Sequence, residues 1–274
     1  MISIILGVKD RTERLVECLA SWSRGYCSLI QEIVIVDWSS QIPIINDKKI
    51  IELIQKLDAK NFLVKIARVE NQKFYNRCQA LNLASSLTDP MYKILLKIDV
   101  DYISVNTDWL RSMPTIDNEL KNYFVVASSL FCDSNYTGFL FVNKKHFNMV
   151  NGYNENFDSH WGYEDKDLEN RLLKIDIENL NQFQKKSKLE KVIFYDIKNH
   201  IYHIPHDNNL RLQNIDAKIL EYAQDKDTLN ILKTLSQSQR EIAETQTSWV
   251  GKSYSVIEQY GNYIRLVMEH TEKY

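Results

Sequence analysis

The strongest constraint on the fold is a regular alternation of short apolar runs and amphipathic stretches over the first hundred residues. The apolar runs have the length of strands buried on both faces; they are Ile2–Val8, residues 33–36, Phe62–Val69 and residues 92–98. Between them, apolar side chains recur at helical spacing, as Leu15, Leu19 and Trp22 do. This order predicts an α/β fold, with a mainly parallel, Rossmann-like sheet flanked by helices on both faces.

The pattern changes after residue 101. We expect strands at Tyr123–Ser129, Gly138–Val142, Val192–Asp196 and Asn199–Ile204, and helices at Lys144–Val150 and Glu164–Lys174. From residue 207 the apolar spacing predicts helix to the end of the chain, with Tyr254, Ile257, Tyr260 and Ile264 on one stripe. The sequence therefore predicts a domain of residues 1–206 and a helical C-terminal extension of residues 207–274, which packs on the core, closes as a lid or forms an oligomer surface.

Composition excludes several classes of protein. Thirty-four Lys and Arg residues oppose thirty-six Asp and Glu residues, a net charge of -2, whereas proteins that bind nucleic acid carry a basic footprint. The four cysteines are scattered, which favours a reducing compartment over a disulfide framework. Without a secretory signal pattern or an apolar run of the ~20 residues that span a membrane, we expect a cytoplasmic protein, with peripheral contact at the inner face of the membrane as an open alternative.

Asp99 and Asp101 follow the fourth predicted strand directly. The carboxyl ends of strands are where ligands bind in open α/β sheets, and strand alternation places both carboxylates on one side. Mg²⁺ and Mn²⁺ bind through one or two carboxylates plus substrate phosphates. The alternative is a strand end with two solvated or capping carboxylates.

Glu164 and Asp165 open a predicted helix just after Trp161 and Gly162. Acidic residues in a first helical turn also complement the helix dipole, which is worth ~0.3–1 kcal/mol each. The neighbouring aromatic and glycine residues favour a sugar site, where a flat apolar face stacks and an acid takes a hydroxyl proton.

His203 and His206 lie at or just past the end of a late predicted strand. A neutral histidine is an effective metal ligand. A histidine satisfied in the core or on the surface remains the alternative for each of them.

In this order along the chain, the motifs resemble those of the GT-A glycosyltransferases, in particular the family 2 type and the related bacterial chondroitin polymerases and galactosyl- and N-acetylgalactosaminyltransferases. The resemblance covers residues 1–206. It rests on the opening strand and loop (residues 2–11), the acidic end of the second strand (36–40), residues 76–82, the D-x-D motif at 99–101, residues 161–165 and the late histidine. Trp38 stands where a second Asp is common, and Tyr163 where Gly is frequent.

The resemblance implies an inverting, metal-dependent transfer from a UDP-sugar to a hydroxyl of a glycan or other acceptor. It assigns the general base to Asp165 and a hydrogen bond with a sugar to Glu164. The implied metal ligands for Mn²⁺ or Mg²⁺ are Asp99, Asp101 and His203, with His206 as the fallback. The implied contacts of the donor nucleotide are Val8, Asp10, Asp37, Arg77, Asn82 and Asp99. The implied contacts of the sugars are Tyr153, Trp161, Gly162 and Tyr163.

The partners implied are a nucleotide sugar and a glycan or glycolipid acceptor, as in bacterial polysaccharide biosynthesis, with a homo-oligomer formed through the C-terminal helices as an open alternative. Two other functions stay open: an inactive nucleotide- or glycan-binding module, compatible with Trp38 and Tyr163, and a sugar nucleotidyltransferase or hydrolase. The chain lacks a P-loop, a G-x-G-x-x-G turn and a G-x-S-x-G elbow. Sugar transfer or hydrolysis separates the first alternative, and pyrophosphate release separates the nucleotidyltransferase.

Overall fold

A computed structural model describes residues 1–24, 28–106, 110, 124–127, 138–157, 162–175, 192–195, 200–205, 237, 240–245 and 251–268. The described strands of the main sheet are β1 (Ile2–Val8), β2 (Ile30–Trp38), β3 (Leu63–Glu70), β4 (Ile94–Lys97), β6 (Phe124–Ala127), β7 (Leu140–Asn143), β8 (Val192–Tyr195), β10 (Tyr254–Tyr260) and β11 (Tyr263–Met268). Their order across the sheet is β10-β11-β3-β2-β1-β4-β7-β6-β8. A second, two-stranded sheet pairs β5 (Tyr102–Ser104) with β9 (Ile201–His203).

The centre of the main sheet is parallel. β1 pairs in parallel with β2 and β4, and β2 pairs in parallel with β3. β7 lies antiparallel to β4 and β6. The prediction of a mainly parallel α/β sheet is therefore confirmed.

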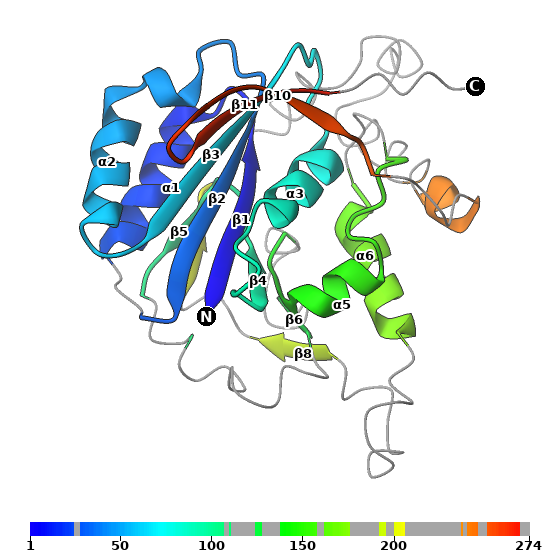
Figure 1. The fold of residues 1–274 in the computed structure, drawn as a ribbon. Helices are drawn as coiled ribbons and strands as arrows, with labels where there is room; N and C mark the ends of the chain where they lie inside the picture. The colour runs from blue at the N-terminus through cyan, green and yellow to red at the C-terminus, as the bar shows by residue number, and fades with distance from the viewer. Residues whose placement is uncertain are drawn as a thin grey trace.

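Helices cover both faces of this sheet (Figure 1). The described helices are α1 (Thr12–Arg24), α2 (Lys48–Asp58), α3 (Arg77–Ser86), α5 (Lys144–Met149), α6 (Glu164–Lys174) and the short 3-10 helix η1 (Ile44–Asn46). Ile4 of β1 packs in a buried cluster with α1 and α2, while its neighbour Ile5 packs in a second cluster with α3, α5 and α6. Adjacent side chains of a strand point to opposite faces, so a continuous apolar strand supplies both cores.

Capping residues fix where two of the helices begin. The Asp47 carboxylate accepts hydrogen bonds from the backbone N–H groups of Lys49 and Ile50 and starts α2. Asn76 accepts from the N–H of Gln79 and starts α3, while its amide donates to the carbonyl of Phe157. The Asn76 cap therefore sets Arg77 in the first turn of α3, on the side of the sheet's carboxyl ends.

The C-terminal region differs from the prediction. Residues 240–245 are helical, but Tyr254–Tyr260 and Tyr263–Met268 form an antiparallel hairpin, and β11 adds in parallel to β3. In Figure 1 this red hairpin lies along the edge of the sheet. The prediction of helix for residues 254–268 is wrong, because β-branched and aromatic residues on either side of a Gly-Asn turn are a hairpin signal. The boundary at residue 206 does not separate this hairpin from the sheet.

Candidate active site

At the carboxyl end of β4, the positively charged side chains of Arg77 and Lys97 contact the carboxylate of Asp99. Asp99 follows this strand, and its Oδ1 pairs with Nη2 of Arg77 from the start of α3. The same oxygen lies 3.1 Å from Nζ of Lys97, the last residue of β4, whose side chain is 1% exposed. Burial opposes ionisation of Asp99, but Arg77 and Lys97 together hold the pKa of its carboxyl well below its usual range.

The start of α6 brings two more carboxylates to the charged side chains of Arg77 and Lys97. Arg77 Nη1 donates to Oε1 of Glu164 at 2.6 Å and lies 3.7 Å from Oδ2 of Asp165. Lys97 Nζ donates to Oδ1 of Asp165 at 3.2 Å. The D-x-D motif and the Glu-Asp pair, which are far apart in sequence, therefore belong to one cluster.

The turn before α6 has a left-handed backbone at two successive residues. Tyr163 has a left-handed backbone with φ of 69°, and Gly162 before it has φ of 102°. Glycine adopts such angles without steric cost, which accounts for a frequent Gly at the position of Tyr163. This turn places Glu164 and Asp165 in the first turn of α6, close to Arg77 and Lys97.

Tyr153 and Asn82 support the site from inside. Tyr153 is fully buried, and its hydroxyl donates to Oδ1 of Asp165 at 2.9 Å. Burial and the charge of Asp165 raise the pKa of Tyr153 well above its ordinary value, so this hydroxyl stays a donor. Asn82 accepts from the N–H of Tyr153 at 2.8 Å and donates to its carbonyl at 2.9 Å and to Oε1 of Glu155 at 2.8 Å. The structure thus places Tyr153 beneath Asp165, where its buried ring is not exposed for stacking on a sugar. The Asn82 side chain, which was predicted to contact the nucleotide, is hydrogen-bonded to the loop that contains Tyr153 and Glu155.

Asp101 and His203 meet because β5 and β9 pair. The register sets Tyr102 opposite His203, and the N–H of Ile204 donates to the carbonyl of Asp101 at 2.9 Å. His203 Nε2 lies 3.7 Å from Oδ2 of Asp101, which also lies 3.5 Å from Nη1 of Arg11.

The chemistry of this pair fits a divalent cation. A carboxylate and an imidazole are both ligands of first-row divalent metals. Asp101 directly precedes β5, His203 is the last residue of its partner strand β9, and both side chains are buried. Asp99 is turned instead toward Arg77 and Lys97. Among the described residues, no group of three His, Cys, Asp or Glu side chains is arranged to hold a metal.

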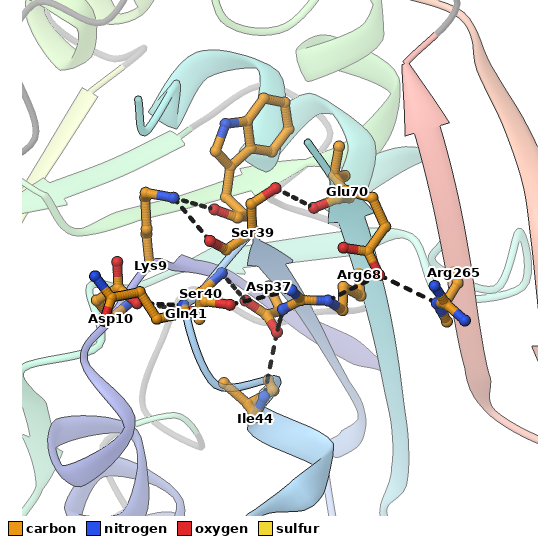
Figure 2. A network of polar contacts seen from close by, with 12 residues as sticks. Lys9, Asp10, Asp37, Ser39, Ser40, Gln41, Ile44, Arg68, Glu70 and Arg265 are labelled. Carbon is orange, nitrogen blue, oxygen red and sulfur yellow. Dashed lines mark hydrogen bonds and ion pairs between the residues drawn. The ribbon is translucent and has the colours of Figure 1, made fainter. Parts of the chain in front are cut away.

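A second polar network holds the loops at the carboxyl ends of β1 and β2 (Figure 2). Asp37 is fully buried, and its oxygens accept from the N–H groups of Ser40 and Ile44 and from Nη1 of Arg68 at 2.6 Å. Lys9 donates to the carbonyls of Trp38, Ser39 and Gln72. Asp37 therefore organises this loop, and it lies in a different network from Arg77 and Asn82.

Two other predicted nucleotide contacts also belong to this loop region. Val8 is buried, whereas Asp10 is exposed, with a φ of 53°. The carboxylate of Asp10 accepts from the N–H of Gln41 at 2.6 Å, and its own N–H donates to Oγ of Ser40 at 3.0 Å. Asp10 thus ties the loop after β1 to the loop after β2.

Other predicted site residues lie outside the described residues, namely Trp161 and His206. Conversely, sequence reasoning missed Lys97 and placed Arg77 with the nucleotide rather than among the carboxylates. The signal for Lys97 was present: a lone lysine in the apolar run of residues 94–98, two residues before Asp99. A charged residue in a buried strand needs a compensating partner.

Known proteins match this chain in two ways: a family model matches one segment of the sequence, and solved structures match the overall fold. Residues 122–207 match the family model described as the N-terminal domain of galactosyltransferase. The catalytic domain of Drosophila β1,4-galactosyltransferase 7, solved with xylobiose, shares 15% identity over 97% of this chain and 92% of its own, with a TM-score of 0.51. The chain has the GT-A glycosyltransferase fold.

Two microbial structures support the GT-A fold as well. TarS 1–349 of S. aureus shares 16% identity over 89% of this chain and 73% of its own, with a TM-score of 0.53. The mannosyltransferase PcManGT of Pyrobaculum calidifontis, solved with GDP-Man and Mn²⁺, shares 10% identity over 90% and 70%, with a TM-score of 0.53. No curated protein matches the sequence. The predicted GT-A resemblance is confirmed, while the family 2 type in particular stays a prediction.

Proposed function

We propose that the protein is an inverting, metal-dependent glycosyltransferase that moves a sugar from a UDP-sugar to a hydroxyl of a glycan or other acceptor. The observation that carries the proposal is the cluster at the carboxyl end of β4, where Asp165 lies beside Asp99 through shared contacts with Lys97 and Arg77. Related structures add support: a mutant of the Drosophila enzyme has been solved with manganese, UDP-Gal and xylobiose, and TarS 1–349 with UDP.

Asp165 is the proposed general base. In the transfer, the acceptor oxygen forms a bond to the anomeric carbon while the bond from that carbon to the UDP oxygen breaks, and UDP leaves with the electron pair. The hydroxyl proton passes to Asp165. A single displacement of this kind inverts the configuration at the anomeric carbon.

Glu164 is the proposed sugar contact. Its Oε1 is held by Arg77, whereas its Oε2 is buried and has no hydrogen-bond partner among the described residues. Burial raises the pKa of Glu164, and the charge of Asp165 adds to the effect although Arg77 opposes it. A buried polar atom of this kind needs a partner, and a sugar hydroxyl would supply one.

The donor diphosphate needs positive charge. Asp101 and His203 are the residues that would hold Mn²⁺ or Mg²⁺, and the bound ion supplies charge that offsets the departing UDP. We infer that the base and ribose lie over the loops after β1 and β2, which Asp10 joins at the surface, with the buried residues Val8 and Asp37 beneath them. Contacts of Trp161, Gly162 and Tyr163 with the sugars remain part of this proposal.

The test is an assay of sugar transfer and of hydrolysis with a panel of UDP-sugars and Mn²⁺. We expect the wild type to turn over at least one UDP-sugar and to bind UDP more weakly once the metal is chelated. Asp165→Asn should lower kcat by about 10²–10⁴-fold, the usual contribution of a general base, with UDP affinity nearly unchanged. Full turnover by this variant would show that the base is assigned wrongly, and no turnover by the wild type would reject the proposed function.

A further inference from the structure

Lys97 is buried too deeply to meet a ligand from solvent. It is the last residue of β4, and its side chain is 1% exposed. Strand alternation places it on the same side as Asp99, and its Nζ lies 3.1 Å from Oδ1 of Asp99 and 3.2 Å from Oδ1 of Asp165. Any influence of Lys97 on a reaction therefore acts through these two carboxylates.

The two oxygens of Asp165 have different surroundings. Oδ1 accepts from Lys97 Nζ and, at 2.9 Å, from the Tyr153 hydroxyl. Among the described residues, the contact of Oδ2 is the 3.7 Å ion pair with Arg77 Nη1, which is longer than a hydrogen bond. Two donors on one oxygen fix the rotation of the carboxylate and turn Oδ1 toward the protein interior.

Resting on the function proposed above, we propose that Lys97 is a positioning residue of the transfer step, which holds Asp165 with Oδ1 inward so that Oδ2 takes the acceptor proton. General-base catalysis requires the base within hydrogen-bond reach of the proton. A displacement of about 1 Å in a catalytic group can cost about 10²-fold in rate. Lys97 would therefore set the reaction rate without touching either substrate.

A purely structural role for Lys97 makes a different prediction. In that case it would only offset the charge of Asp99, which Arg77 already pairs with. Its loss would then lower stability and donor affinity, and the loss of rate would be independent of Asp165.

Lys97→Met tests the proposal, with Lys65→Met as the matched control. Lys65 also pairs with a buried carboxylate, Glu32 at 2.7 Å, but Glu32 lies near the beginning of β2, at the opposite end of the strands from the candidate site. We expect Lys97→Met to lower kcat by about 10–100-fold, in the range of a misplaced catalytic group. Its calorimetric Kd for UDP with Mn²⁺ and its donor KM should stay within about threefold of the wild type, which is within ~0.7 kcal/mol. Lys65→Met should keep kcat and both affinities.

Coupling to Asp165 separates positioning from structure. Residues that act through one another give non-additive losses, so adding Lys97→Met to Asp165→Asn should cause no further loss of kcat. Unchanged kcat in Lys97→Met, or fully additive losses in the double variant, would overturn the proposal. If Lys97→Met does not fold, Tyr153→Phe removes the other donor to Oδ1, and an unchanged kcat in that variant would overturn it equally.

The wild-type arm separates this inference from the function on which it rests. No turnover of any UDP-sugar by the wild type would overturn the proposed function and the role of Lys97 together. Turnover by the wild type that Lys97→Met matches would overturn the role of Lys97 alone.

Discussion

Gly138 lies against Asp99, and the lack of a side chain at Gly138 leaves the space that the Asp99 carboxylate occupies. A Cβ added at Gly138 would lie 2.1 Å from Oδ2 of Asp99 and 3.0 Å from the Tyr102 hydroxyl. Gly138→Ala should therefore push Asp99 out of its contacts with Arg77 and Lys97. We expect a loss of about tenfold or more in kcat/KM, because Arg77 and Lys97 also contact Asp165, the proposed base, and a displaced catalytic group costs up to about 10²-fold.

Gly251→Ala is the matched control for this substitution, because the nearest atom to its added Cβ, Oε1 of Glu155, is at an ordinary 3.9 Å. Parallel measurements of kcat/KM and of UDP binding by calorimetry compare the two variants. Equal activities would show that the position of Asp99 does not matter for turnover.

Glu155 gives a prediction for stability against pH. It is buried, accepts hydrogen bonds from Asn82 and from the N–H of Lys252, and burial raises its pKa above the ordinary 4.5 although these bonds oppose the shift. A raised folded-state pKa means that the folded protein holds this proton more tightly than the unfolded chain. Its contribution to stability is therefore full below pH 4.5 and is lost as the pH rises through the folded-state pKa.

The measurement is the free energy of unfolding in urea, for wild type and Glu155→Gln, between pH 4 and 7. We expect the difference, wild type minus variant, to fall as the pH rises. A difference that rises over this range would mean that the hydrogen bonds outweigh burial.

At the scale of single residues, the sequence predicts which residue types gather but not which way they face. Asp99, Glu164 and Asp165 come together because strand ends and a helix start are readable patterns. Asp37 and Tyr153 turn inward, because the loop N–H groups and the Asp165 carboxylate bind them there. Such partners lie far along the chain, and residue spacing does not encode the direction of a side chain in a loop.

At the scale of elements, β11 belongs to the core of the sheet. Leu266 is 4% exposed and packs in the cluster with α3, and β11 is paired along Ile66–Glu70 of β3. Leu266→Ala should lower the free energy of unfolding by about 2–5 kcal/mol, the usual cost of such a truncation in a core.

Val256→Ala, on the outer strand β10, is the matched control. Val256 is 59% exposed, so we expect a change within about 0.5 kcal/mol. Urea unfolding at neutral pH measures both variants. A cost at Leu266 no larger than at Val256 would mean that the hairpin is not packed on the sheet.

Elements with one dominant period were predictable, and elements with a mixed pattern were not. α6 begins at Glu164 and ends at Lys174, as predicted, because its apolar residues recur at helical spacing alone. Tyr254, Ile257, Tyr260 and Ile264 also fit a helical stripe, but the β-branched and aromatic content around Gly261 fits a hairpin better, and the open edge of β3 supplies the partner that stabilises it.

At the scale of the whole molecule, charged contacts join the C-terminal hairpin to the loop that Asp37 holds. Arg265 of β11 pairs with Glu70 at 3.1 Å, Glu70 pairs with Arg68 at 3.0 Å, and Arg68 pairs with Asp37 at 2.6 Å (Figure 2). The hairpin is thus connected to the proposed nucleotide loop by side chains as well as by the sheet.

In the part of the chain that the structure describes, no helix combines the length and the apolar character of a membrane span.

This arrangement predicts that the hairpin and the parallel sheet unfold together. Strands that share a sheet and a core open as one cooperative unit, whereas an independent extension would open separately. In hydrogen exchange followed by mass spectrometry, the amides of Tyr263–Met268 should be protected to nearly the same free energy as those of β3, Leu63–Glu70. The helical residues 240–245, in which Ile242 and Ala243 are partly buried and the other side chains are exposed, provide an internal reference for weaker protection. Exchange of β11 as fast as this reference, with β3 still protected, would place residues 254–268 outside the cooperative core and restore the separate extension that the sequence alone predicts.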